Sequence, residues 1–280
     1  MISKTKPFIK QYWLLYFAVF VIVLTIKYLY SKAATNDLQW ILAPTARWVG
    51  ILSGIAFERE AGLGYINHDF RFIIASSCSG VQFMTITSVM LIYSFVHRMR
   101  TMKRGLCWTA SCFGFSYLFT IFVNGFRIVL SIYLPLYLSC QDIYSGWLTP
   151  EKLHTIIGTA VYFSSLLIIH PIAGYVSARI SKRGMLNICH EKDKSHAKII
   201  SGRMPPVLCY FSITLGIPLL TKAYKNNGEK FMEFAMLITT VCLSAMLLFC
   251  LISFFRRIII NLKNDFTLKK KSKPAIIETQ

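Results

Sequence analysis

The sequence predicts an all-α polytopic membrane protein with about six transmembrane helices, one or two interfacial or re-entrant segments, and a small outer loop or hairpin. Hydrophobic residues make up 55% of the 280 residues and charged residues only 15%, with a mean hydropathy of +0.52. Several apolar stretches approach the roughly 20 residues that a membrane-spanning helix needs. The basic residues lie beside these stretches, as they do in chains whose cytoplasmic loops are positive.

The net charge of +19 comes mainly from four basic blocks. Three lysines precede residue 12, four basic residues lie in 97–105, seven in 179–203 and seven from residue 256 onward. Because these blocks flank apolar segments, we assign them to the cytoplasmic face, where they also meet anionic membrane lipids. We expect no nucleic-acid partner.

The first predicted span runs from about residue 12 to 30. It is too long for a signal peptide and lacks a small-residue cleavage site, so we expect residues 1–37 to be a retained N-terminal anchor. The other spans are expected at about 80–96, 106–123, 153–175, 206–221 and 231–255. Six crossings place all four basic blocks and both termini in the cytoplasm.

Residues 38–57 are apolar and long enough to cross, but they contain Arg47. A crossing here would move the basic segment 97–105 to the outer side. We therefore expect an interfacial or re-entrant helix, with Trp40 and Trp48 at headgroup depth.

Residues 106–138 are too long for one simple span, yet two crossings would put the third basic block outside. We expect one crossing followed by a bent or interfacial extension, with a break at Asn124-Gly125 and a second bend at Pro135.

Residues 58–77 have a different pattern, with alternating β-branched and aromatic residues around the turn residues Asn67, His68 and Asp69. This pattern predicts a small outer hairpin that leads to Cys78. The tail from Lys263 onward is expected to be disordered.

The eight cysteines show no metal-binding spacing, and we expect neither a metal nor a cofactor. Cys78 and Cys140 are the two that the topology brings to the outer aqueous phase, so a disulfide between them is one reading of Cys78. The other is a reactive thiol. Cys78 lies at the outer start of a span, where the positive end of a helix dipole favours a thiolate. Ser79 and Gly80 leave room for a substrate backbone.

Arg127 is embedded in the apolar segment VNGFRIVLSIYL. A charge at such a depth is costly and indicates a function, such as holding a thiolate or stabilising an oxyanion. The alternative is an arginine that extends to the lipid headgroups. Asn124 precedes Arg127 by three residues and shares its face if the segment is helical.

His154 begins the longest clean span and is suited to proton transfer, although a histidine at the interface can also lack a role. Gly158, one turn later, would let another helix approach. The topology brings the ends with Cys78, Arg127 and His154 to one non-cytoplasmic face. A thiol, a fixed cation and an imidazole together are the groups of a thiol acyl-transfer site.

These segments also resemble a known family. SSCSGVQF around Cys78, NGFR ending at Arg127 and the later His154 are similar to the three signature blocks of the exosortase/archaeosortase family, in the same order. The upstream ILAPTARWVGILSGIAFERE is similar to that family as well. Within it, the chain most resembles the exosortase K branch. The resemblance covers roughly residues 38–175.

The resemblance implies a membrane cysteine transpeptidase of prokaryotic cell membranes. Its partner would be an exported protein whose C-terminal signal has a short motif, a transmembrane helix and a basic tail, and its acceptor an unknown lipid or amine. By motif, Cys78 would be the nucleophile, Arg127 the charge stabiliser and His154 the acid and base. Many members have arginine soon after Cys-Ser-Gly, where this chain has Val81 and Gln82, so substrate or acceptor recognition is expected to differ.

The domains then follow in order. An anchor (1–37) precedes the exosortase-like core (38–175), a basic cytoplasmic loop (176–204), a C-terminal pair of spans (205–255) and a basic cytoplasmic tail (256–280). The alternative function is that of a non-enzymatic membrane transporter or assembly scaffold. Paired broken helices in matching halves would favour a transporter, and the sequence has none.

Overall fold

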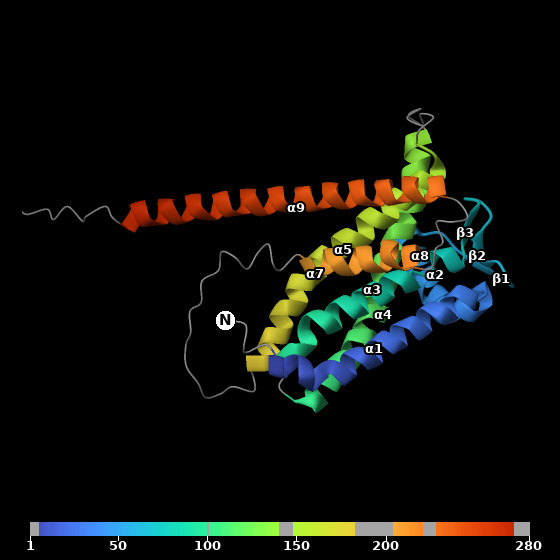
Figure 1. Cartoon of the computed structure of the whole chain (residues 1–280). Coiled ribbons are helices and arrows are strands. Elements are labelled where there is room, and N and C mark those ends of the chain that lie inside the picture. Colours follow the sequence, from blue (N-terminus) through green and yellow to red (C-terminus); the bar gives the residue numbers. More distant parts are fainter. Residues whose placement is uncertain (1–5, 100, 140–147, 183–203, 221–227, 272–280) are drawn as a thin grey trace, which may run out of the picture.

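The computed structural model describes residues 6–99, 101–139, 148–182, 204–220 and 228–271. Over these residues the chain is a bundle of long helices with one small sheet (Figure 1). Five helical stretches are long and apolar enough to cross a membrane, and a shorter apolar helix, Met204–Leu219, accompanies them. The prediction of an all-α polytopic membrane protein is confirmed.

The long helices are α1 (Lys6–Lys32), α3 (Val81–Phe95), α4 (Met102–Ser139), α5 (Pro150–Lys182) and α9 (Gly228–Lys271). The shorter helix is built from α7 (Met204–Phe211), the π-helical turn η4 (Ser212–Gly216) and α8 (Ile217–Leu220). The start of α1, the end of α3 and the end of α5 lie at one end of the bundle, away from the sheet (Figure 1). This order agrees with the predicted alternation of crossings, and the side of the membrane that each end faces stays a prediction.

Helix α3 forms the centre of the bundle. Helix α3 lies in the apolar stretch Ser76–Arg98, and 72% of the most apolar part of this stretch is buried inside the protein. The corresponding buried share is 17% for α1 and 11% for α9. Its polar residues fit an apolar core because their hydroxyls bond within the helix. Thr85, Thr87 and Ser88 each donate to the carbonyl four residues earlier, at 2.9 Å. The helix can therefore pack on every side.

Helix α4 corrects one prediction. It runs unbroken through Asn124-Gly125 and Pro135 for 38 residues, about 57 Å at 1.5 Å per residue. The glycine is not a break, because the ring of Trp48 occupies the space that a side chain at Gly125 would need. Trp48 also donates from Nε1 to the carbonyl of Phe122 at 3.3 Å. The Asn-Gly pair thus allows close packing of α4 against another helix.

That helix is α2 (Gln39–Ser53), which follows the 3₁₀ turn η1 (Thr35–Leu38). It has 15 residues and ends at Gly54, whose φ of 71° is left-handed. It is too short to count among the candidate spans. Its placement at the membrane interface stays a prediction.

The predicted hairpin is present and is part of a three-stranded antiparallel sheet. Its strands are β1 (Glu58–Glu60), β2 (Gly64–Asn67) and β3 (Phe72–Ile74), in the order β1-β2-β3. Asn67 pairs with Phe72 across the predicted turn, and its Oδ1 accepts the backbone N–H of Phe70 at 2.8 Å. The 3₁₀ turn η2 (Ser76–Cys78) follows directly, so the sheet leads the chain into Cys78.

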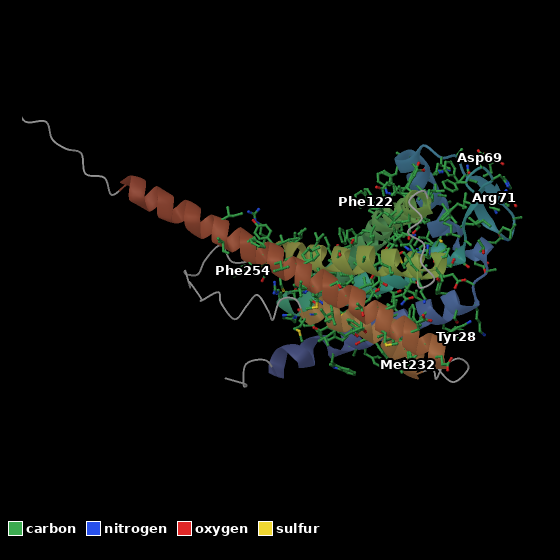
Figure 2. All side chains as sticks on the ribbon, turned by 90° about the horizontal axis from the view of Figure 1, so that it is seen from above. Tyr28, Asp69, Arg71, Phe122, Met232 and Phe254 are labelled. Atoms are coloured by element: carbon green, nitrogen blue, oxygen red, sulfur yellow. The ribbon has the colours of Figure 1, made fainter. Side chains whose placement is uncertain are left out.

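Helices α1 and α9 lie at the periphery and expose large apolar side chains, as helices that face lipid do. Helix α9 continues beyond the other helices, and Phe254 lies where it leaves them (Figure 2). It reaches Lys271, so the prediction of disorder from Lys263 is wrong over residues 263–271. Good helix formers such as Leu and Lys continue the helix there.

Candidate active site

Helix α4 brings Asn124 and Arg127 to one face, as their spacing predicts. Arg127 Nη1 donates to Asn124 Oδ1 at 3.3 Å. Both side chains are buried, and Arg127 is only 6% exposed. Arg127 is therefore not an arginine that extends to the lipid headgroups, and that alternative is excluded.

Helix α5 faces Arg127 with three residues spaced four apart. Near its start, His154 Nε2 is hydrogen-bonded to Arg127 Nη2. At Gly158, a Cβ atom would lie 3.2 Å from Arg127 Nε. At Tyr162, the hydroxyl accepts from Arg127 Nη1 at 3.4 Å, and the ring centroid lies 5.5 Å from Arg127 Cζ. The predicted close approach at Gly158 is thus between α5 and the guanidinium of α4.

Asn124 is the hub of this site. Its Nδ2 donates to the backbone carbonyl of Cys78 at 2.5 Å, and its Oδ1 accepts the Tyr162 hydroxyl at 2.7 Å as well as Arg127 Nη1. One amide therefore connects the turn before α3 with α4 and α5. Since a carbonyl can only accept, the bond to Cys78 also assigns which atom of the Asn124 amide is nitrogen.

Tyr162 is the residue that the sequence did not single out. It stacks on Phe83 of α3, with ring centroids 4.4 Å apart and an interplanar angle of 11°. The only sequence signal is its spacing, since Tyr162 follows Gly158 by four residues and His154 by eight. Many membrane helices contain a tyrosine among apolar residues that has no binding or catalytic role, so its presence alone does not indicate one.

Cys78 is bonded to this site through its backbone carbonyl, and its buried side chain lies within electrostatic range of Tyr162. Gly80 is the N-cap of α3, with a left-handed φ of 71°, so Cys78 in η2 precedes the helix. Cys78 thus lies at the start of the apolar stretch Ser76–Arg98, as predicted, but in a 3₁₀ turn before α3, because the left-handed glycine changes the direction of the chain there. The side chain is 5% exposed and packs in an apolar cluster with Ile41, Leu42 and Ile128.

Cys78 is a free cysteine. No described residue forms a disulfide with it, Cys140 lies outside the described residues, and the disulfide between the two stays a hypothesis. Its Sγ lies 3.9 Å from Ser77 Oγ. Tyr30 of α1 steadies the same turn by donating to the carbonyl of Ser76 at 3.2 Å.

A cavity of about 220 Å³ opens where these helices meet. Its lining includes Ser77, Gly80, Arg127, His154, Gly158 and Tyr162. Cys78 does not line it, although the neighbouring Ser77 does. Ser79 is fully buried and its hydroxyl has no hydrogen-bond partner among the described residues. Gly80 leaves room for α4 as well as for a ligand, since a Cβ there would lie 2.9 Å from Thr120 Cγ2 and 3.2 Å from Asn124 Cγ.

Arg127 gives the cavity an uncompensated positive charge. The described residues form two ion pairs, His68–Glu60 in the sheet and Lys152–Glu233 between α5 and α9, and neither includes Arg127. Its Nε–H has no hydrogen-bond partner in the described part of the chain. A buried cation without a carboxylate favours an anion beside it.

The Arg127–His154 bond defines the state of the imidazole. A guanidinium has only N–H donors, so His154 Nε2 must accept, and the proton of the neutral ring is on Nδ1. The arrangement therefore combines a fixed cation with a neutral imidazole that can take up a proton once Arg127 releases it.

The fold and the site define a class, a multi-pass membrane protein with an Arg-His-Tyr-Asn cluster, in which Arg127 and Asn124 are buried, beside a cysteine-bearing turn. A family model described as transmembrane exosortase (Exosortase_EpsH) matches residues 2–171, more than half of the chain. The chain therefore belongs to the transmembrane exosortase family. The exosortase K branch stays a prediction. No curated protein and no solved structure is similar enough to count as a match.

Proposed function

We propose that this protein is a membrane cysteine transpeptidase that cleaves the C-terminal sorting signal of exported proteins and transfers them to an acceptor. The observation that supports this most is the Asn124 amide, which links the Cys78 turn to Arg127 and, through it, to His154. Membership of the transmembrane exosortase family supports the same function. The substrate is an exported protein with a short motif, a transmembrane helix and a basic tail.

In the first half-reaction, the Cys78 side chain turns from its apolar cluster into the cavity beside Ser77. Arg127 releases His154, whose Nε2 takes the thiol proton, and the thiolate attacks the scissile carbonyl carbon. The carbon–sulfur bond forms as the carbonyl oxygen becomes an oxyanion, which accepts the N–H groups that Arg127 has freed. The carbon–nitrogen bond then breaks, and the imidazolium gives its proton to the leaving amine.

In the second half-reaction, His154 removes a proton from the acceptor, a lipid-linked group or an amine. The acceptor attacks the thioester carbonyl and displaces the Cys78 thiolate, which takes the proton back from His154. Tethering by the substrate's own membrane helix fixes the depth of the scissile bond and raises its effective concentration at the site. The site faces the non-cytoplasmic side of a prokaryotic cell membrane, both termini lie in the cytoplasm, and basic blocks meet anionic lipid there.

The test uses the full chain in cells, with a reporter that ends in the motif, helix and basic tail of an exported protein encoded beside this chain's gene. A tag after the basic tail is lost when the signal is cleaved. We expect loss of the tag with the natural chain and with Cys112→Ala, a matched change at another buried cysteine. Cys78→Ala is expected to retain the tag while inserting normally. Cleavage by Cys78→Ala would contradict the proposal and favour the scaffold.

A further inference from the structure

The cavity continues past the end of the family match. That match ends at residue 171, yet Tyr210, Thr214, Phe234 and Ile238 also line the cavity. Helix α7 packs against α3 and α5, and α9 packs against α5, so the C-terminal helices contribute to the same cavity as Arg127 and His154. We name these four residues the C-terminal wall.

Thr214 gives this wall an open hydrogen-bonding group. It lies in the π-helical turn η4, and a π-helical turn inside an α-helix often marks a functional site. Thr214 is 7% exposed, and its Oγ1 makes no hydrogen bond with the described residues. The Tyr210 hydroxyl is a close neighbour of the side chains of Thr159 and Thr214. The contact between the Tyr210 and Thr214 hydroxyls does not have the geometry of a hydrogen bond. A buried hydroxyl on a cavity surface is poised for a ligand.

Helix α9 supplies the apolar part of the wall. Phe234 and Ile238 are four residues apart and so share one face, and Ile238 is 1% exposed. The ion pair between Lys152 Nζ and Glu233 Oε1, at 2.6 Å, holds this part of α9 against the start of α5, two residues before His154. The part of the wall on α9 therefore lies beside the start of α5, near the proposed acid and base.

The chemistry of the wall limits what can bind to it. It contains two hydroxyls and two apolar side chains and no charged group, while the Arg127 cation lines the same cavity. A basic substrate side chain would meet that cation, and an acidic one would take the N–H groups that the oxyanion needs. At about 220 Å³ the cavity is smaller than the roughly 300–1,000 Å³ of a site for a drug-sized ligand, so it suits only a residue or two.

We infer that the C-terminal wall is a subsite for one uncharged residue of the substrate peptide beside the scissile bond, and that Thr214 hydrogen-bonds to this residue. The inference rests on the proposed function and adds the specificity of the same site. Thr214 acts on binding, whereas Cys78, Arg127 and His154 act on bond making and breaking.

The probes are biotinylated dipeptidyl fluoromethyl ketones, which alkylate a cysteine thiol and differ in the residue next to the ketone. The purified full chain in lipid nanodiscs is treated with probes containing threonine, valine, phenylalanine, aspartate or lysine at that position. The rate of Cys78 alkylation is followed by mass spectrometry as a function of probe concentration. This gives a half-saturating concentration and a maximal rate for each probe.

We expect threonine and valine probes to label Cys78 at least about tenfold faster than aspartate or lysine probes. Thr214→Val is expected to raise the half-saturating concentration of the threonine probe by about 5- to 10-fold, the usual effect of one hydrogen bond, without changing the maximal rate. Thr214→Ser keeps the hydroxyl and is expected to have the same half-saturating concentration of the threonine probe as the natural chain. Ile238→Ala enlarges the wall and is expected to favour the phenylalanine probe.

Thr240→Val is the matched control, since the Thr240 hydroxyl is bonded to the Met236 carbonyl on the exposed part of α9. Equal labelling of Cys78 by all probes, in the natural chain and in Thr214→Val, would overturn the inference and leave the proposed function intact. Absence of Cys78 labelling by every probe would instead contradict the proposed function.

Discussion

The side-chain amide of Asn124 donates to the backbone carbonyl of Cys78 at 2.5 Å and so ties the middle of α4 to the turn before α3. The same amide accepts the Tyr162 hydroxyl and Arg127 Nη1. The position of the thiol-bearing turn is therefore set by the same group that orients the buried cation.

Asn124→Asp is expected to lower processing of the reporter by at least about tenfold and to lower the thermal unfolding temperature. The carboxylate has no N–H for the Cys78 carbonyl, and leaving a buried polar group unsatisfied costs about 1–3 kcal/mol. Asn36→Asp is the control, because Asn36 Oδ1 accepts from the backbone N–H of Gly62 and a carboxylate can do the same. Equal loss in both variants would show that the effect is a general one of added charge.

Tyr162→Phe removes only the hydroxyl that donates to Asn124. Since the ring still stacks on Phe83, we expect a normal unfolding temperature and processing reduced by about tenfold. Tyr162→Ala is expected to lower both, because the stacking is lost too. Full processing by the Phe variant would limit Tyr162 to packing.

Gly158→Ala separates stability from activity. Alanine favours a helix over glycine by about 1 kcal/mol, but its Cβ would lie 3.2 Å from Arg127 Nε and move the guanidinium. We expect unchanged or higher thermal stability with reduced processing. Gly114→Ala on α4 meets nothing within 4 Å, so it is expected to gain stability and keep full activity. Reduced processing by both variants would contradict the Arg127 explanation.

Arg127→Lys keeps the charge but loses the planar fork that reaches Asn124, Tyr162 and His154. Removing one oxyanion donor typically lowers a rate by about 10²–10³, and we expect a loss of that order in reporter cleavage. Arg98→Lys is the control, because Arg98 follows the C-terminal end of α3, whereas the Cys78 turn precedes its start, and this variant is expected to be active. Full cleavage by the Arg127→Lys variant would reduce Arg127 to a point charge.

The topology can be tested with an impermeant thiol reagent on intact cells. Cysteines are introduced at Asp69 in the sheet region or at Lys103 near the start of α4, two exposed positions, with Cys107, Cys140, Cys189 and Cys250 changed to serine. Labelling is expected at Asp69→Cys and absent at Lys103→Cys until the cells are opened. The reverse result would invert the predicted orientation.

Much of the fold follows from local pattern. Apolar length predicted the spans, alternation predicted the sheet, and the three-residue spacing predicted the Asn124–Arg127 pair. What the pattern does not contain is the rotation of one helix against another. Tyr162 faces Asn124 only because Gly158 lets α5 approach Arg127, and Gly125 continues α4 only because Trp48 packs there.

The position of Cys78 just before α3 also depends on packing. Ser-Cys-Ser-Gly is compatible with a helix that begins before or after the cysteine, and the close contact of Gly80 with Thr120 and Asn124 decides in favour of the later start. The C-terminal wall also depends on packing between distant segments, and a π-helical turn leaves no mark in apolar periodicity.

Gly80 has a consequence for protein engineering. Its left-handed φ of 71° disfavours any L side chain, and its neighbours across the interface leave no volume for one. Substitutions at Gly80 are therefore expected to disturb the cysteine turn. A library that keeps the turn and α4 constant and varies Tyr210, Thr214, Phe234 and Ile238 would alter the proposed subsite and leave the proposed catalytic groups unchanged.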